Sequence, residues 1–108
     1  MASETPVLDT IAAMTLDSVE RSNLDADALI LVRLAALAAV GANPASYLMH
    51  VGPGIEAGVT VDQVQDVLVA VAPIIGTART LSASLAITEA LGFAIAVMEA
   101  ELEEELEG

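Results

Sequence analysis

The side chains that can do acid–base chemistry gather in one short stretch. Residues 43–54 read NPASYLMHVGPG and hold the only histidine of the chain, His50, and its only tyrosine, Tyr47. Imidazole takes up and releases protons near neutral pH, so His50 is the candidate catalytic residue, as a general base or acid. The other interpretation is a structural histidine hydrogen-bonded inside a helical core. The residues alone leave both open.

Other chemistry at His50 has less support in the sequence. There is no cysteine and no second histidine to complete a metal site, so we expect no metal and no cofactor. Ser46 precedes His50 by four residues and shares its helical face, but a serine and a histidine at this spacing often occur by chance. The segment GPGIEAG lacks the lysine and hydroxyl residue of a phosphate-binding loop.

Arginine is the only basic residue type, at Arg21, Arg33 and Arg79. Arg33 lies within the apolar segment ALILVRLAALAAV, and a buried guanidinium needs a carboxylate or an anionic ligand. Two interpretations stay open: a structural ion pair, with Glu89 a candidate partner, or one wall of an anion-binding pocket that also includes Arg79. Arg33, Tyr47 and Arg79 are therefore candidate substrate-binding residues.

The elements that would position these residues are all predicted to be helices. Apolar residues recur at spacings of three and four, without strand-like alternation, which predicts an all-α domain. We expect a short helix after Thr5-Pro6, one or two turns over residues 15–23, and a buried helix from Asp25 to Gly41. A third helix should begin at Asn43-Pro44, carry His50 and break at residues 52–54.

The second half of the chain predicts two further helices. Thr60 and Gln63 have the spacing of a capping box, and Gly76 should end the helix that they begin. A last helix should run from about residue 78. Its apolar stripe continues through the acidic segment 93–108, which favours a helical extension with a solvated acidic face over an unstructured tail. We expect one domain, residues 1–108.

Composition excludes some partners and favours others. A net charge of −13 argues against nucleic acid and against an anionic membrane surface. The apolar run 34–55 contains Pro44 and Pro53, so we do not expect it to span a membrane, and the first residues resemble no signal segment. We expect a cytoplasmic protein. Its 56% hydrophobic residues exceed what one small core can bury, which predicts a homo-oligomer.

Residues 24–92 resemble the carboxymuconolactone decarboxylase family, which includes the alkylhydroperoxidase D-like proteins. The resemblance rests on the order of the Leu/Ala-rich helix, His50, the segment AGVT, the helix VDQVQDVLVAVAP and the turn GTART. It implies an alkylhydroperoxidase D-like helical bundle that assembles as a trimer or hexamer. It also places His50 where the decarboxylase branch transfers a proton on a carboxylated lactone.

The sequence departs from this family at several positions. Asn43 and Ser46 stand where the redox branch has its two cysteines, so thiol-based peroxide reduction is excluded. The upstream glutamate of that branch falls near Ile30 or Leu31. The resemblance and these departures leave two candidate functions. One is decarboxylase-like proton transfer by His50 on a small carboxylated, lactone-like substrate. The other is a non-catalytic homo-oligomer that binds a small ligand or serves in assembly.

Overall fold

Helices account for almost all of the computed structural model, which describes residues 3–107 and has no strand among them. Met1, Ala2 and Gly108 lie outside the described residues. The helices are α1 Pro6–Arg21, α2 Ala26–Val40, α3 Pro44–Leu48, α4 Val51–Glu56, α5 Val61–Ile75 and α6 Thr77–Glu107. The predicted all-α class is confirmed.

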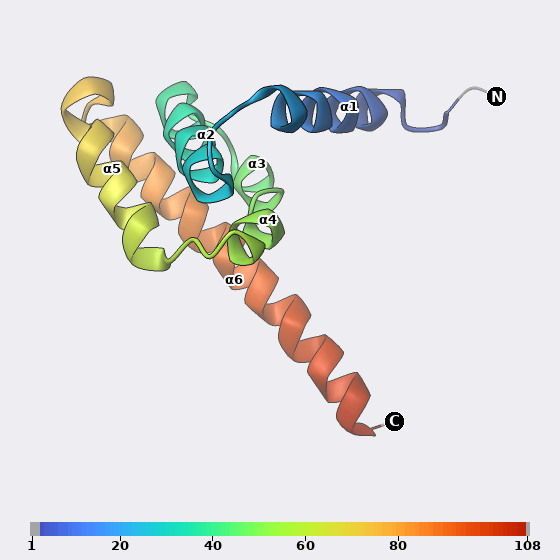
Figure 1. Cartoon of the computed structure of the whole chain (residues 1–108). Helices are drawn as coiled ribbons and strands as arrows, with labels where there is room; N and C mark the ends of the chain where they lie inside the picture. The colour runs from blue at the N-terminus through green and yellow to red at the C-terminus, as the bar shows by residue number, and fades with distance from the viewer. Residues whose placement is uncertain (1–2, 108) are drawn as a thin grey trace.

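The core lies where α2, α3 and the first half of α6 meet (Figure 1). In Figure 1, α5 and the first half of α6 run side by side in opposite directions, and α2 packs on both. The buried hydrophobic residues are Ile30, Leu34, Ala38, Tyr47, Ala83, Ala86 and Ala90. The buried hydrophobic residues that α6 contributes to this core are three alanines. Because alanine side chains are small, the backbones of neighbouring helices can approach the backbone of α6 closely.

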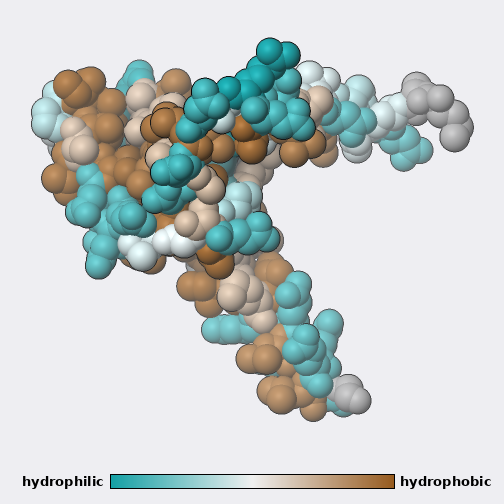
Figure 2. All heavy atoms as spheres, in the orientation of Figure 1, coloured by the Kyte–Doolittle hydropathy of each residue, from teal (hydrophilic) through white to brown (hydrophobic). Residues whose placement is uncertain are grey.

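Two helical segments extend away from this core. Helix α1 has no buried residue, and every residue from 95 to 107 is exposed. The radius of gyration is 15.6 Å, against about 13 Å for a compact chain of this length. Apolar side chains face outward on the body and along the end of α6 (Figure 2). A single copy therefore leaves much apolar surface uncovered.

Local capping explains the start of α3, the start of α5 and the end of α2. The side chain of Asn43 accepts a hydrogen bond from the Ser46 backbone N–H at 3.2 Å and begins α3. Thr60 and Gln63 form the predicted capping box of α5, with bonds of 3.0 and 3.1 Å. Helix α2 ends at Gly41, whose φ of 71° is in the left-handed region.

The chain differs from expectation around residues 15–23 and 49–54. Helix α1 is continuous to Arg21, so the separate turns expected after Met14 do not form. The third helix ends at Leu48, before the predicted break, and His50 occupies the N-cap position of α4. Pro53 lies in the first turn of α4, where its missing N–H leaves no hydrogen bond unmade.

The acidic extension is helical, as expected, over its described residues 93–107. By length and composition α6 could also cross a membrane, and only 17% of its most apolar stretch is buried in the chain. This is weak evidence, because a helix that packs in a soluble assembly has the same properties. Ala83, Ala86 and Ala90 of this helix do pack in the core.

Candidate functional site

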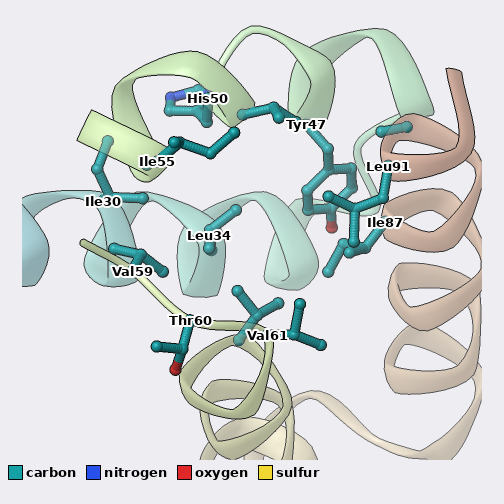
Figure 3. A pocket seen from close by; sticks show the side chains of 14 residues that line it. Ile30, Leu34, Tyr47, His50, Ile55, Val59, Thr60, Val61, Ile87 and Leu91 are labelled. Carbon is teal, nitrogen blue, oxygen red and sulfur yellow. The ribbon is translucent and has the colours of Figure 1, made fainter. Parts of the chain in front are cut away.

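The candidate site is a half-open pocket of about 240 Å³ beside the core. Helices α2 to α6 and the connection before α5 all contribute to its wall (Figure 3). Most lining residues are apolar: Ile30, Leu34, Tyr47, His50, Val51, Gly54, Ile55, Val59, Thr60, Val61, Val64, Ile87, Ala90 and Leu91. A pocket of this kind suits a small, largely apolar molecule.

His50 lies at one end of this pocket, half-buried, and its ring is held by the backbone. Its Nδ1 is 2.9 Å from the carbonyl oxygen of Ser46. A carbonyl only accepts hydrogen bonds, so Nδ1 carries a proton and donates it. In the neutral ring the other nitrogen, Nε2, then has the free lone pair, and no described residue is hydrogen-bonded to it. His50 is thus oriented with one nitrogen available for proton transfer.

The hydroxyl of Ser46 takes no part in this arrangement. It is 3.4 Å from the side chain of Asn43, whose oxygen also caps α3. The two positions where the redox branch has cysteines therefore serve here to begin α3, and the backbone of Ser46 orients His50. The structure gives no support to a serine nucleophile at this site.

Thr60 faces His50 across the pocket, but its oxygen is used elsewhere. In Figure 3 the hydroxyl of Thr60 points away from His50, in agreement with its role as acceptor for the Gln63 N–H. Tyr47 also lines the pocket, and its side chain extends from α3 into the space between α2 and α6. Its residue exposure is only 2%, and its hydroxyl has no hydrogen-bond partner among the described residues. Burial raises the pKa of Tyr47 above the ordinary value of tyrosine.

The structure brings His50 and Tyr47 to one pocket but places Arg33 and Arg79 elsewhere. Arg33 is half-buried and donates from Nη2 to the Ser18 hydroxyl at 3.0 Å and to the Thr15 carbonyl at 3.4 Å. It joins α2 to α1 with no carboxylate involved. Arg79, at the start of α6, donates to the carbonyl oxygen of Ala39. Glu89 is exposed and pairs with neither arginine.

Most of the pocket wall could not be identified from the sequence. Ile30 and Leu34 lie in α2, which the sequence predicts to be buried, but this helix is apolar nearly all round, so the sequence does not indicate which of its faces lines the pocket. Val59, Ile87 and Leu91 carry no such signal, because they join the pocket wall only through the packing of α6 and of the connection before α5. Ile30, one of the two residues near which the resemblance places the redox-branch glutamate, forms apolar wall here.

A second, more open hollow between α5 and α6 is lined by residues without a titratable side chain. No group of three or more His, Asp or Glu residues within residues 3–107 is arranged to hold a metal ion.

Comparison with known proteins gives one significant match. No curated protein and no solved structure matches the chain significantly. The model of the carboxymuconolactone decarboxylase family matches residues 5–90, which include every residue that lines the pocket except Leu91. The matched region begins at residue 5, upstream of the segment 24–92 whose sequence resembles the family. The chain therefore belongs to the carboxymuconolactone decarboxylase family.

Proposed function

We propose that the chain is a carboxymuconolactone decarboxylase-like enzyme in which His50 transfers a proton on a small carboxylated, lactone-like substrate. The observation that carries this proposal is the geometry of His50. Its ring lines an apolar pocket, donates from Nδ1 to the Ser46 carbonyl and keeps Nε2 free of protein partners. Thiol-based reduction of peroxides is not part of the proposal, because the chain has no cysteine.

The proposed step is a decarboxylation completed by protonation. The bond between the ring carbon and the carboxylate breaks, carbon dioxide leaves, and the electron pair stays on the ring carbon. The imidazolium of His50 then gives its Nε2 proton to that carbon and becomes neutral. The Ser46 carbonyl keeps the ring in place through both protonation states, since Nδ1 carries a proton in each.

The pocket offers a charged substrate few polar groups. Within one chain no arginine lines it, so the His50 imidazolium is the cation that its wall can place beside a bound carboxylate. The negative charge stays on the ring carbon when carbon dioxide leaves, and it is neutralised when the Nε2 proton reaches that carbon. A contact between the substrate and Arg33 or Arg79 stays a prediction. Such a contact requires that the arginine leaves its present hydrogen-bond acceptors, or that it comes from a second copy of the chain.

The test compares turnover of small carboxylated lactones by the wild type, His50→Ala and Ser46→Ala. We expect His50→Ala to lose roughly 10²- to 10⁴-fold in rate, the usual contribution of a placed proton-transfer group. Ser46→Ala is the matched control and should keep its activity, because His50 contacts only the backbone of Ser46. Equal rates for wild type and His50→Ala would refute a role in proton transfer.

A non-catalytic ligand-binding or assembly protein of the same fold is the second candidate. Its support is the family resemblance, which puts Asn43 and Ser46 at the positions of the two cysteines of the redox branch and an apolar residue, Ile30 or Leu31, near the upstream glutamate. Absence of turnover in the wild type, together with saturable binding of small apolar molecules, would support this candidate.

The proposed working form is a homo-oligomer, a trimer or hexamer, in the cytoplasm. Its support is the large amount of apolar surface that one copy leaves exposed, together with the family resemblance. We propose no nucleic acid or membrane partner, on the ground of the −13 net charge.

A further inference from the structure

We infer that Pro53 is a positioning residue for the proposed reaction: it keeps α3 and α4 as separate helices and thereby leaves the carbonyl of Ser46 to the ring of His50. This role rests on the proposed function, in which His50 transfers the proton. Pro53 itself does not line the pocket. It lies three residues after His50, between two glycines, and acts through the backbone.

The hydrogen bonds at His50 show what the break between the two helices does. In a continuous α-helix the backbone N–H of His50 would donate to the carbonyl of Ser46, four residues back. In the structure this N–H donates to the carbonyl of Tyr47, three residues back, at 2.9 Å. The Ser46 carbonyl instead accepts the hydrogen bond from Nδ1 of the His50 ring, also at 2.9 Å. The break therefore supplies the group that orients the imidazole.

The backbone angles agree with this change of partner. The ψ angles of Met49 and His50 are −20° and −4°, whereas an α-helix has a ψ of about −42°. The φ of His50 is −101°. The chain is thus tightened at these two residues, and α4 begins again immediately after them.

Pro53 is compatible with a separate α4 but not with a continuation of α3. A single helix over residues 44–56 would need the N–H of residue 53 to donate to the carbonyl of Met49. Proline has no N–H, and its ring would clash with that carbonyl. In the separate α4, Pro53 lies in the first turn, where N–H groups have no partner within the helix. The Gly54 N–H donates to the His50 carbonyl at 2.9 Å.

The flanking glycines provide the matched control. Glycine also disfavours a helix, but much less than proline does. A Cβ added at Gly52 would meet nothing within 4 Å, so Gly52→Ala raises the helix propensity of the segment without a new contact and retains Pro53. Pro53→Ala raises the propensity as well, and in addition restores the N–H and removes the ring. A difference between the two variants therefore belongs to the proline.

The proton position on His50 tests the inference directly. His50 is the only histidine, so ¹⁵N NMR of the full-length protein observes its ring nitrogens without ambiguity. The spectra are recorded at about pH 8.5, where imidazole is ordinarily neutral. In the wild type we expect the proton on Nδ1. In Pro53→Ala the ratio of Nδ1–H to Nε2–H rings should fall about fivefold, the effect of about one hydrogen bond, because the His50 N–H then takes the Ser46 carbonyl.

Backbone shifts report on the helix break in the same samples. In Pro53→Ala the ¹³Cα shifts of Met49 and His50 should move toward those of a continuous helix. In Gly52→Ala these shifts and the proton position should stay as in the wild type. Light scattering checks that the three proteins have the same mass, so that a change of assembly is not mistaken for a change at His50.

The lactone assay connects this geometry with turnover. Pro53→Ala should lower kcat roughly tenfold, because the imidazole then meets the substrate in a less fixed orientation. Gly52→Ala should keep the kcat of the wild type. A wild type without lactone turnover, whose ring nevertheless changes its proton position in Pro53→Ala, would refute the proposed enzyme and leave the positioning role of Pro53 intact.

Three results would overturn the inference. Helical ¹³Cα shifts in Pro53→Ala with an unchanged proton position would mean that the Ser46 carbonyl holds the ring without the break. Unchanged shifts in Pro53→Ala would mean that packing of α4, and not Pro53, maintains the break. Equal changes in Gly52→Ala and Pro53→Ala would assign the effect to helix propensity alone.

Discussion

At the scale of single residues, Tyr47 and His50 show opposite relations between burial and hydrogen bonding. His50 is half-buried, and its Nδ1 has a backbone partner. Tyr47 is almost wholly buried, and its hydroxyl is the one buried side-chain polar atom without a partner among the described residues. The spacing of Ser46 and His50 in the sequence is common by chance, and only the structure shows a contact, which uses the Ser46 carbonyl.

The raised pKa of Tyr47 predicts a specific alkaline transition. Burial favours the neutral phenol, so folding contributes stability that is complete below about pH 10 and is lost as the pH rises above the ordinary pKa of tyrosine. The chain contains no lysine or cysteine, so few other side chains titrate in this range. We expect urea unfolding at pH 9 and 11 to show a loss of stability in the wild type.

Tyr47→Phe provides the control for this transition. It removes the only phenol, so its stability should change much less between pH 9 and 11. At pH 7 the variant should be as stable as the wild type or more stable, because an unpaired buried hydroxyl costs about 1–3 kcal/mol. Tyrosinate absorbance that appears in the folded protein at ordinary pH values for tyrosine would contradict the burial.

At the scale of elements, local signals determine where helices begin, and longer-range contacts determine how they are held. The capping box of α5 is an example of the first kind. Helix α1 is an example of the second, since none of its residues is buried and Arg33 supplies its side-chain hydrogen bonds to α2.

Loss of the capping box should have a measurable thermal effect. Thr60→Ala removes the acceptor for the Gln63 N–H and should lower stability by about 1 kcal/mol, or roughly 4–8 °C in Tm. Thr5→Ala is the matched control, because Thr5 occupies the N-cap of α1 without a side-chain bond to the helix backbone. Similar shifts in the two variants would argue against the capping role.

Loss of the Arg33 contacts should release α1. In Arg33→Leu we expect faster amide hydrogen exchange over residues 6–21, with the exchange of α5 unchanged, because α1 has little other attachment in one copy. Arg21→Gln breaks an exposed pair within α1 and should leave exchange there nearly unchanged. If α1 stays protected in Arg33→Leu, contacts outside the single chain must hold it.

At the scale of the whole molecule, the balance of apolar surface and charge governs assembly. Exposed large apolar residues lie on α1 and along residues 93–107, including Ile11, Ile95, Leu102 and Leu106. Assembly covers this surface but brings together copies that each carry a charge of −13. Light scattering should give a multiple of 11.0 kDa, and added salt should strengthen the association by screening the charges.

Truncation after Glu99 tests the extension. It removes Leu102, Leu106 and five glutamates, so the net charge changes from −13 to −8. We expect weaker assembly, because the leucine stripe is exposed in a single copy. A full-length control with the same five glutamates changed to glutamine keeps the leucines and should assemble at least as well as wild type. Unchanged mass in the truncated protein would show that the extension is free.

The sequence by itself determined the all-α class and several helix ends, although it predicted neither the continuous α1 nor the separation of α3 from α4. Caps such as Asn43 and Thr60 act through hydrogen bonds within a few residues, and the nearly all-apolar sequence of α2 indicates that this helix is buried, so these features need no knowledge of distant contacts. The sequence also singled out His50 and excluded thiol chemistry.

Only the tertiary structure decided the composition of the site. Residues as distant in sequence as Ile30 and Leu91 meet at one pocket because α2 packs against α6, and no local pattern encodes that meeting. The same packing directs Arg33 toward α1 and Arg79 toward Ala39. A helical wheel shows which face a residue occupies but not which neighbour covers that face, so the uncharged character of the pocket became visible only in the folded chain.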